Sequence, residues 1–191
     1  MALICASFGI SWLRHNSWSQ TYVGLRKLVN EVLPNGTSKI EAEDAALCQL
    51  AVISANQLME IALFDLLKRY IKAPQGFNLS EKLYENSGYY FAITELSEKA
   101  VGKMIDLSKE PFISTERLRK RRNATVHKSS ALADIAMAQS ALYTAVQGVK
   151  ALCVHFNEPK KYDVFLKAYP LENGCYFSQI VFPEDRLLVK K

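Results

Sequence analysis

Arg122, Asn123 and His127 form a short polar segment whose side chains suit the chemistry of phosphodiesters. Arginine carries a permanent, planar positive charge that binds phosphate. Histidine takes up and releases a proton near neutral pH, and the asparagine amide donates and accepts hydrogen bonds at the same time. Together these residue types are suited to cleaving a phosphodiester bond without a metal ion.

The spacing of these residues limits how they act together. On a regular helix, Asn123 and His127 share a face, and Arg119 lies on that face one turn earlier. Arg122 points about 140° away from His127 at 3.6 residues per turn. One copy of the segment therefore converges on a single phosphate only if the helix breaks near it. Alternatively, two protomers place their copies in a shared cleft on a twofold axis.

The segment lies within a basic run, and a further lysine follows it. A basic helix of this kind is most often a solvated surface, because an arginine and a histidine at this spacing are common. The net charge of +5 is compatible with an anionic partner but does not identify one. If the segment is functional, we expect the neighbouring cations to contact RNA phosphates with little sequence preference: Arg117, Arg119, Lys120, Arg121 and Lys128.

Apolar residues at three- and four-residue intervals predict the helices that position this segment. The strongest pattern predicts a long central helix that is touched on several sides and opens with a capping box at 38–41. Gly148 lies within the last long pattern, where it is tolerable if a neighbouring helix approaches closely. The predicted helices cover residues 20–33, 40–72, 80–86, 89–107 and 130–156, and a further helix that contains the basic run begins near Ser114.

The chain changes character after Pro159. Residues 162–169 and 175–182 are rich in β-branched and aromatic side chains, and Asn173-Gly174 between them is a typical hairpin turn. We therefore expect a mainly α fold, in which residues 1–157 form a bundle of four to six helices. Residues 158–191 are expected to form a small C-terminal β-hairpin packed on that bundle.

The composition predicts an ordinary globular protein without a metal or a cofactor. The four cysteines lie far apart, without metal-ligand spacing, so we expect small buried thiols in a reducing compartment. Residues 1–13 are apolar, but they lack a cationic start and are too short to cross a bilayer. We expect a cytosolic protein that does not bind a membrane.

The motif RNATVH at 122–127, together with the helix order over residues 20–156, resembles the HEPN superfamily. The signature of these small helical domains is R-x(4–6)-H, with a polar residue, often asparagine, after the arginine. The resemblance implies a metal-independent endoribonuclease, usually a homodimer. It also implies a role as the toxin of a toxin–antitoxin module or in antiviral defence.

By this resemblance, Arg122 and His127 are expected to be catalytic, and Asn123 is expected to support them. Family members often add a polar residue from an earlier helix. Glu60 is the candidate here, although a solvated glutamate on the outer face is an equally good interpretation.

Two alternatives remain open. The first is a non-catalytic HEPN-like module that binds RNA, a nucleotide or a partner such as an antitoxin or a nucleotidyltransferase. The second is a helical interaction protein whose basic run is only a solvated face. Base stacking by Tyr89, Tyr90 and Phe91 is a further expectation, although such a cluster at a helix start more often belongs to the core.

Overall fold

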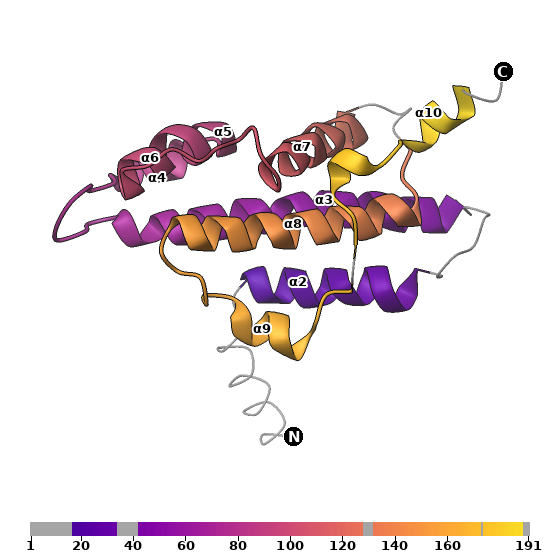
Figure 1. Ribbon diagram of the computed structural model, residues 1–191, viewed down its shortest axis with the longest axis horizontal. Coiled ribbons are helices and arrows are strands. Elements are labelled where there is room, and N and C mark those ends of the chain that lie inside the picture. The colour runs from indigo at the N-terminus through magenta and orange to yellow at the C-terminus, as the bar shows by residue number, and fades with distance from the viewer. Residues whose placement is uncertain (1–16, 34–41, 128–131, 173, 189–191) are drawn as a thin grey trace.

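The computed structural model describes residues 17–33, 42–127, 132–172 and 174–188. These residues form a helical bundle (Figure 1), and within them no β-strand occurs, only an isolated bridge between Ile71 and Leu79. The elements are α2 (Ser17–Lys27), η1 (Leu28–Val32, a π-helical turn), α3 (Ala42–Leu67), η2 (Lys68–Tyr70), α4 (Glu81–Asn86), α5 (Tyr89–Phe91), η3 (Ala92–Leu96), α6 (Ser97–Val101), α7 (Phe112–His127), α8 (Ile135–His155), α9 (Asp163–Ala168), η4 (Phe177–Gln179) and α10 (Pro183–Leu188).

The core lies around two long helices, α3 and α8, which run side by side through the middle of the molecule (Figure 1). Helix α2 packs along one side of this pair, and α7 with the short helices α4 to α6 covers the opposite side. Because α3 is contacted from several sides, it buries apolar residues around most of its circumference. The prediction of a long central helix is confirmed.

Gly148 on α8 lets α7 sit deep in the groove between α3 and α8. A Cβ atom at this position would lie 2.5 Å from Sδ of Met59 on α3 and 2.7 Å from Cγ2 of Thr115 on α7. Both distances are too short for a real carbon atom, so the close approach depends on glycine. The sequence-based interpretation of Gly148 is confirmed.

The helix predicted over 89–107 ends early. Gly102 adopts the left-handed conformation, with φ of 76°, and its N–H donates to the carbonyl oxygen of Glu98, which closes α6. Helix α7 then begins at Phe112, two residues before the predicted start. Its first turn is held by the carboxylate of Glu110, which accepts a hydrogen bond of 2.9 Å from the Ser114 hydroxyl.

The predicted C-terminal β-hairpin is wrong in the part of the tail that the structure describes; Asn173 of the expected turn lies outside it. The tail forms α9, η4 and α10 instead. Its backbone polar groups bond to side chains of the bundle rather than to a second strand. The N–H of Phe177, for example, donates to Oγ1 of Thr144 on α8 at 2.8 Å. The aromatic enrichment reflects burial against the bundle, since Phe177 is fully buried.

Several sequence features lie outside the described residues: residues 1–13, the turn at 34–36, the capping box at 38–41 and Lys128. In the part that is described, the helix Asp44–Tyr70 is long and apolar enough to cross a membrane. Within the most apolar 18-residue stretch of this helix, 56% is buried inside the protein, as expected for the core helix of a globular domain. The helix is therefore weak support for a membrane location.

Candidate functional site

Helix α7 runs without a break from Phe112 to His127 and so carries the whole motif. Four polar residues spaced three or four positions apart form one line along it. We call this line the α7 stripe: Glu116, Arg119, Asn123 and His127. The helix does not break at the motif, so Arg122 stays about 140° from His127 around the helix axis.

The side chain of Arg122 nevertheless bends toward the stripe. Its Nη1 donates to Oδ1 of Asn123 at 3.0 Å, which brings the guanidinium against the neighbouring amide. Its Nε is buried, and no atom of the described residues accepts a hydrogen bond from it. The buried Nε of Arg121 likewise has no acceptor. Arg122 differs from Arg121 in having no carboxylate partner among the described residues.

His127 ends the described part of α7, and its side chain is exposed to solvent. Asn123 lies one turn earlier on the stripe and is half-buried. The exposed imidazole is therefore accessible to a large ligand.

Glu60 lies on the half-buried face of α3 that meets the α7 stripe. The buried Asn56 donates to its Oε1 at 2.8 Å. Arg119 donates to both carboxylate oxygens of Glu116, each at 2.8 Å. These hydrogen bonds, with added attraction from Tyr89 and Glu60, raise the pKa of Arg119. Glu116 thus holds Arg119 on the stripe, and Glu60 on α3 adds only a smaller electrostatic effect.

A cavity of about 220 Å³ opens beside Glu116, between α5, η3 and α7. Burial raises the pKa of the Tyr89 phenol, and the nearby carboxylates of Glu60 and Glu116 raise it further. The phenol therefore stays protonated at neutral pH. We call this space the α5–α7 cavity; its lining is mostly aromatic and aliphatic: Tyr89, Tyr90, Ile93, Leu107, Phe112, Thr115 and Glu116.

The opposite side of α7 is occupied by the C-terminal tail. The side chain of Arg121 is 4% exposed and pairs with Glu184, and it also donates to the carbonyl oxygen of Leu132. Arg117 donates to two backbone carbonyls of the tail. Both guanidinium groups lie over the ring of Phe182. The distance to the ring centroid is 4.5 Å from Cζ of Arg117 and 4.4 Å from Cζ of Arg121. We call these contacts the C-terminal clamp.

The structure thus separates the four described cations of the five that the sequence placed in an RNA-binding patch. Arg117 and Arg121 belong to the C-terminal clamp, and Arg119 is held by Glu116. Lys120 is exposed, with its Nζ 3.7 Å from Glu116, and Lys128 lies outside the described residues. Sequence reasoning missed Glu116 because it was interpreted as part of a helix start, and it missed the clamp because its contacts join residues far apart in the chain. The hydrogen bond from Asn56 to Glu60 joins residues one helical turn apart, a spacing that the sequence does offer.

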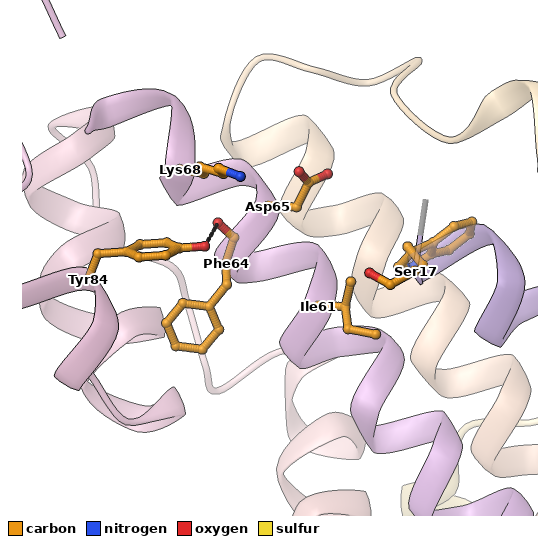
Figure 2. Close-up of a pocket in the computed structure, with 7 residues that line it drawn as sticks. Ser17, Ile61, Phe64, Asp65, Lys68 and Tyr84 are labelled. Atoms are coloured by element: carbon orange, nitrogen blue, oxygen red, sulfur yellow. Dashed lines mark hydrogen bonds between the residues drawn. The ribbon is translucent and has the colours of Figure 1, made fainter. Parts of the chain in front are cut away.

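A second cavity, of about 260 Å³, lies between α2, α3 and α4 (Figure 2). Its polar groups serve the fold. Asp65 accepts a hydrogen bond from the Tyr162 hydroxyl at 2.9 Å and pairs with Lys161 at 3.1 Å. The hydroxyl of Tyr84 donates to the carbonyl oxygen of Phe64. We assign no chemistry to this cavity.

Two of the three described cysteines are buried, as expected, whereas Cys175 is exposed. Cys48 and Cys153 are buried and unpaired, and burial raises the pKa of their thiols to about 11 and about 12. Both thiols are therefore protonated and unreactive at neutral pH. Among the described residues, no three histidine, cysteine or carboxylate side chains group to hold a metal ion.

Comparison of the chain with known protein families, with curated proteins and with solved structures finds no significant match in any of the three.

Proposed function

We propose that this chain is a metal-independent endoribonuclease of the HEPN type that acts as a homodimer. One observation carries the proposal: the exposed imidazole of His127 shares a helix face with Asn123, and the guanidinium of Arg122 reaches that same amide. Cleavage of a phosphodiester needs a proton-transfer group and a cation for the phosphate. The residue types present here supply both.

In the proposed reaction, the ribose 2′-oxygen attacks the adjacent phosphorus, and the bond from phosphorus to the 5′-oxygen breaks. His127 takes the 2′-hydroxyl proton or gives a proton to the departing 5′-oxygen, and a water molecule takes the other role. Arg122 binds the non-bridging oxygens and stabilises the charge that develops on them. The products are a 2′,3′-cyclic phosphate and a 5′-hydroxyl.

Glu60 and Asn123 act as positioning residues in this proposal. Asn123 accepts the hydrogen bond from Arg122 and so fixes the direction of its guanidinium. Glu60 lies close enough to Arg119 to affect its pKa, and it adds a smaller electrostatic effect to the hydrogen bonds by which Glu116 keeps that cation on the stripe. The remaining exposed cation of the basic run, Lys120, attracts the RNA backbone.

The geometry of α7 supports the proposed dimer. Because the helix is unbroken, Arg122 and His127 of one chain diverge by about 140°, and a single copy does not surround a phosphate. A twofold axis beside the stripe brings His127 of one chain toward Arg122 of the other. We propose that the active site is completed in this way between two chains.

A second candidate is a non-catalytic module that binds RNA, a nucleotide or a partner protein such as an antitoxin or a nucleotidyltransferase. The same divergence of Arg122 and His127 favours it, since binding does not require the two to converge. For the ribonuclease we further propose a cytosolic role in a toxin–antitoxin or antiviral system.

A cleavage assay on single-stranded RNA, with and without EDTA, tests the proposal. We expect cleavage that EDTA leaves unchanged, with 2′,3′-cyclic phosphate ends. Arg122→Ala should lower the rate by roughly a hundredfold to a thousandfold, as loss of a charge-stabilising group does. Lys150→Ala, which removes an exposed cation from α8, is the matched control and should keep the wild-type rate. Cleavage that requires Mg²⁺ would exclude the mechanism, and binding without cleavage would favour the second candidate.

A further inference from the structure

We propose that the α5–α7 cavity binds one unpaired base of the RNA and prefers guanine. The inference rests on the proposed function in taking RNA as the ligand, and it adds a specificity site away from the reacting phosphate. The cavity is smaller than the roughly 300–1,000 Å³ of pockets for drug-sized molecules. At about 220 Å³, it suits a single aromatic heterocycle.

The lining of the cavity provides a stacking surface. Tyr89, Tyr90 and Phe112 contribute three aromatic rings to the lining. Tyr90 is 61% exposed although it lines the cavity, so its ring is open to an incoming base. Unpaired RNA bases are recognised mainly by stacking on aromatic side chains and by hydrogen bonds to their edges.

Glu116 provides the hydrogen-bond acceptor that selects among bases. Its hydrogen bonds to Arg119 lower the pKa of its carboxyl group, so it is ionised and accepts hydrogen bonds only. A carboxylate has about four acceptor sites, and Arg119 uses one on each oxygen. Guanine presents two adjacent donors, N1–H and N2–H₂, whereas the single donor of uracil lies between two acceptors. The carboxylate therefore favours guanine and disfavours uracil.

The position of the cavity relative to His127 fits one continuous strand. Glu116 and His127 lie on the same stripe, eleven positions apart, which is about 16 Å along a helix of 1.5 Å rise. An extended strand covers that length with a few nucleotides. Between the two ends, Lys120 and Arg122 supply charge for the phosphates. We infer that the selected base lies a few nucleotides from the cleaved bond.

Fluorescence anisotropy with labelled single-stranded RNA tests this site. All proteins carry His127→Ala, so that the RNA stays intact during the measurement. Oligomers with one central guanine in a uracil background are compared with all-uracil oligomers of the same length. We expect the guanine oligomer to bind more tightly, and Tyr90→Ala to weaken its binding by roughly tenfold, as loss of one stacking contact does.

Two further variants test the separate parts of the inference. Tyr90→Phe tests whether the ring alone is needed, and Glu116→Gln tests the choice of base. Tyr90→Phe keeps the ring and should retain the affinity, and Tyr90→Ala should retain the melting temperature because the side chain is exposed. Glu116→Gln replaces one acceptor with a donor and should reduce the preference for guanine over uracil. Equal affinities for Tyr90→Ala and its parent would overturn the base site and point to a protein side chain as the occupant.

The outcomes also distinguish this inference from the proposed function. Binding that depends on Tyr90 and prefers guanine, in a protein whose wild type does not cleave RNA, would leave the base site standing without the ribonuclease. Cleavage by the wild type together with binding that ignores Tyr90 would reject the base site and keep the ribonuclease.

Discussion

The two sides of α7 use the same residue type for opposite purposes. On the clamp side, Arg117 and Arg121 are bound by backbone carbonyls, an aromatic ring and the Glu184 carboxylate, all from the C-terminal tail. On the stripe side, Arg122 donates a hydrogen bond to the adjacent Asn123 and has no carboxylate partner among the described residues. His127 there is exposed. Partners supplied by distant parts of the chain, rather than the local density of charge, decide which arginine is available to a ligand.

This difference predicts that substitutions on the stripe side lower activity, whereas substitutions on the clamp side lower stability. His127→Ala should lower the RNA cleavage rate by about a thousandfold, within the usual range for loss of a general acid–base group. Because the side chain is exposed, the melting temperature should stay near that of the wild type. Cleavage rates and thermal unfolding of the same preparation check this. A large fall in melting temperature would contradict the assignment of His127 to the open side.

On the clamp side, the main effect should be on stability. Glu184→Ala leaves the buried guanidinium of Arg121 without its carboxylate, which should lower the free energy of unfolding by about 3 kcal/mol. Asp185→Ala removes an exposed neighbouring carboxylate and should change it by less than about 0.5 kcal/mol. Denaturant titrations of both variants measure the difference. Equal effects would show that the clamp does not stabilise the fold.

Gly148 bears on both sides of α7, because it lets this helix pack closely against α3 and α8. Gly148→Ala should destabilise the protein by about 1 kcal/mol, since overpacking against Thr115 and Met59 outweighs the better helix propensity of alanine. Gly24 on α2 has open space where a Cβ would be. Gly24→Ala should therefore stabilise the protein by roughly 0.5–1 kcal/mol. Chemical denaturation of the pair tests the sign of each effect.

The clamp should also weaken in acid. The hydrogen bond from Arg121 lowers the pKa of Glu184 below its ordinary value of 4.5. A carboxyl group whose pKa is lower in the folded state stabilises the protein above its unfolded-state pKa. That contribution is lost as the pH falls through the folded-state value.

The pH test uses Glu184→Gln, which cannot ionise. The difference in unfolding free energy between wild type and this variant should be largest at pH 7 and shrink toward pH 3. A difference that stays constant over this range would show that the charge on Glu184 contributes nothing to the clamp.

Much of the fold could be predicted from local sequence patterns. Apolar periodicity predicted α3 and α8, and the regular helix through the motif places Asn123 and His127 on one face as the spacing required. Gly148 was interpretable because a glycine inside a long apolar helix has few uses other than close packing. These features depend on residues within a few turns of one another.

Contacts between distant segments were not predictable in the same way. The tail has the composition of a hairpin, yet its hydrogen bonds go to side chains of α7 and α8, such as Thr144. Nothing in the basic run distinguishes Arg121 from Arg122, because Glu184 lies more than sixty residues away. The sequence favours Glu60 only by its central place in a helix. Its proximity to Arg119 depends on the packing of α3 on α7 and is not predictable from the local sequence.

A mixed-dimer experiment tests the central proposal that the open side of α7 supplies half of an active site. Arg122→Ala and His127→Ala proteins, each inactive alone, are mixed under conditions in which subunits exchange. If each site takes Arg122 from one chain and His127 from the other, the mixture should recover roughly a quarter of the wild-type cleavage rate. This is because half of the dimers are mixed and each mixed dimer has one intact site. No recovery despite demonstrated exchange, or full activity in a strict monomer, would contradict the account.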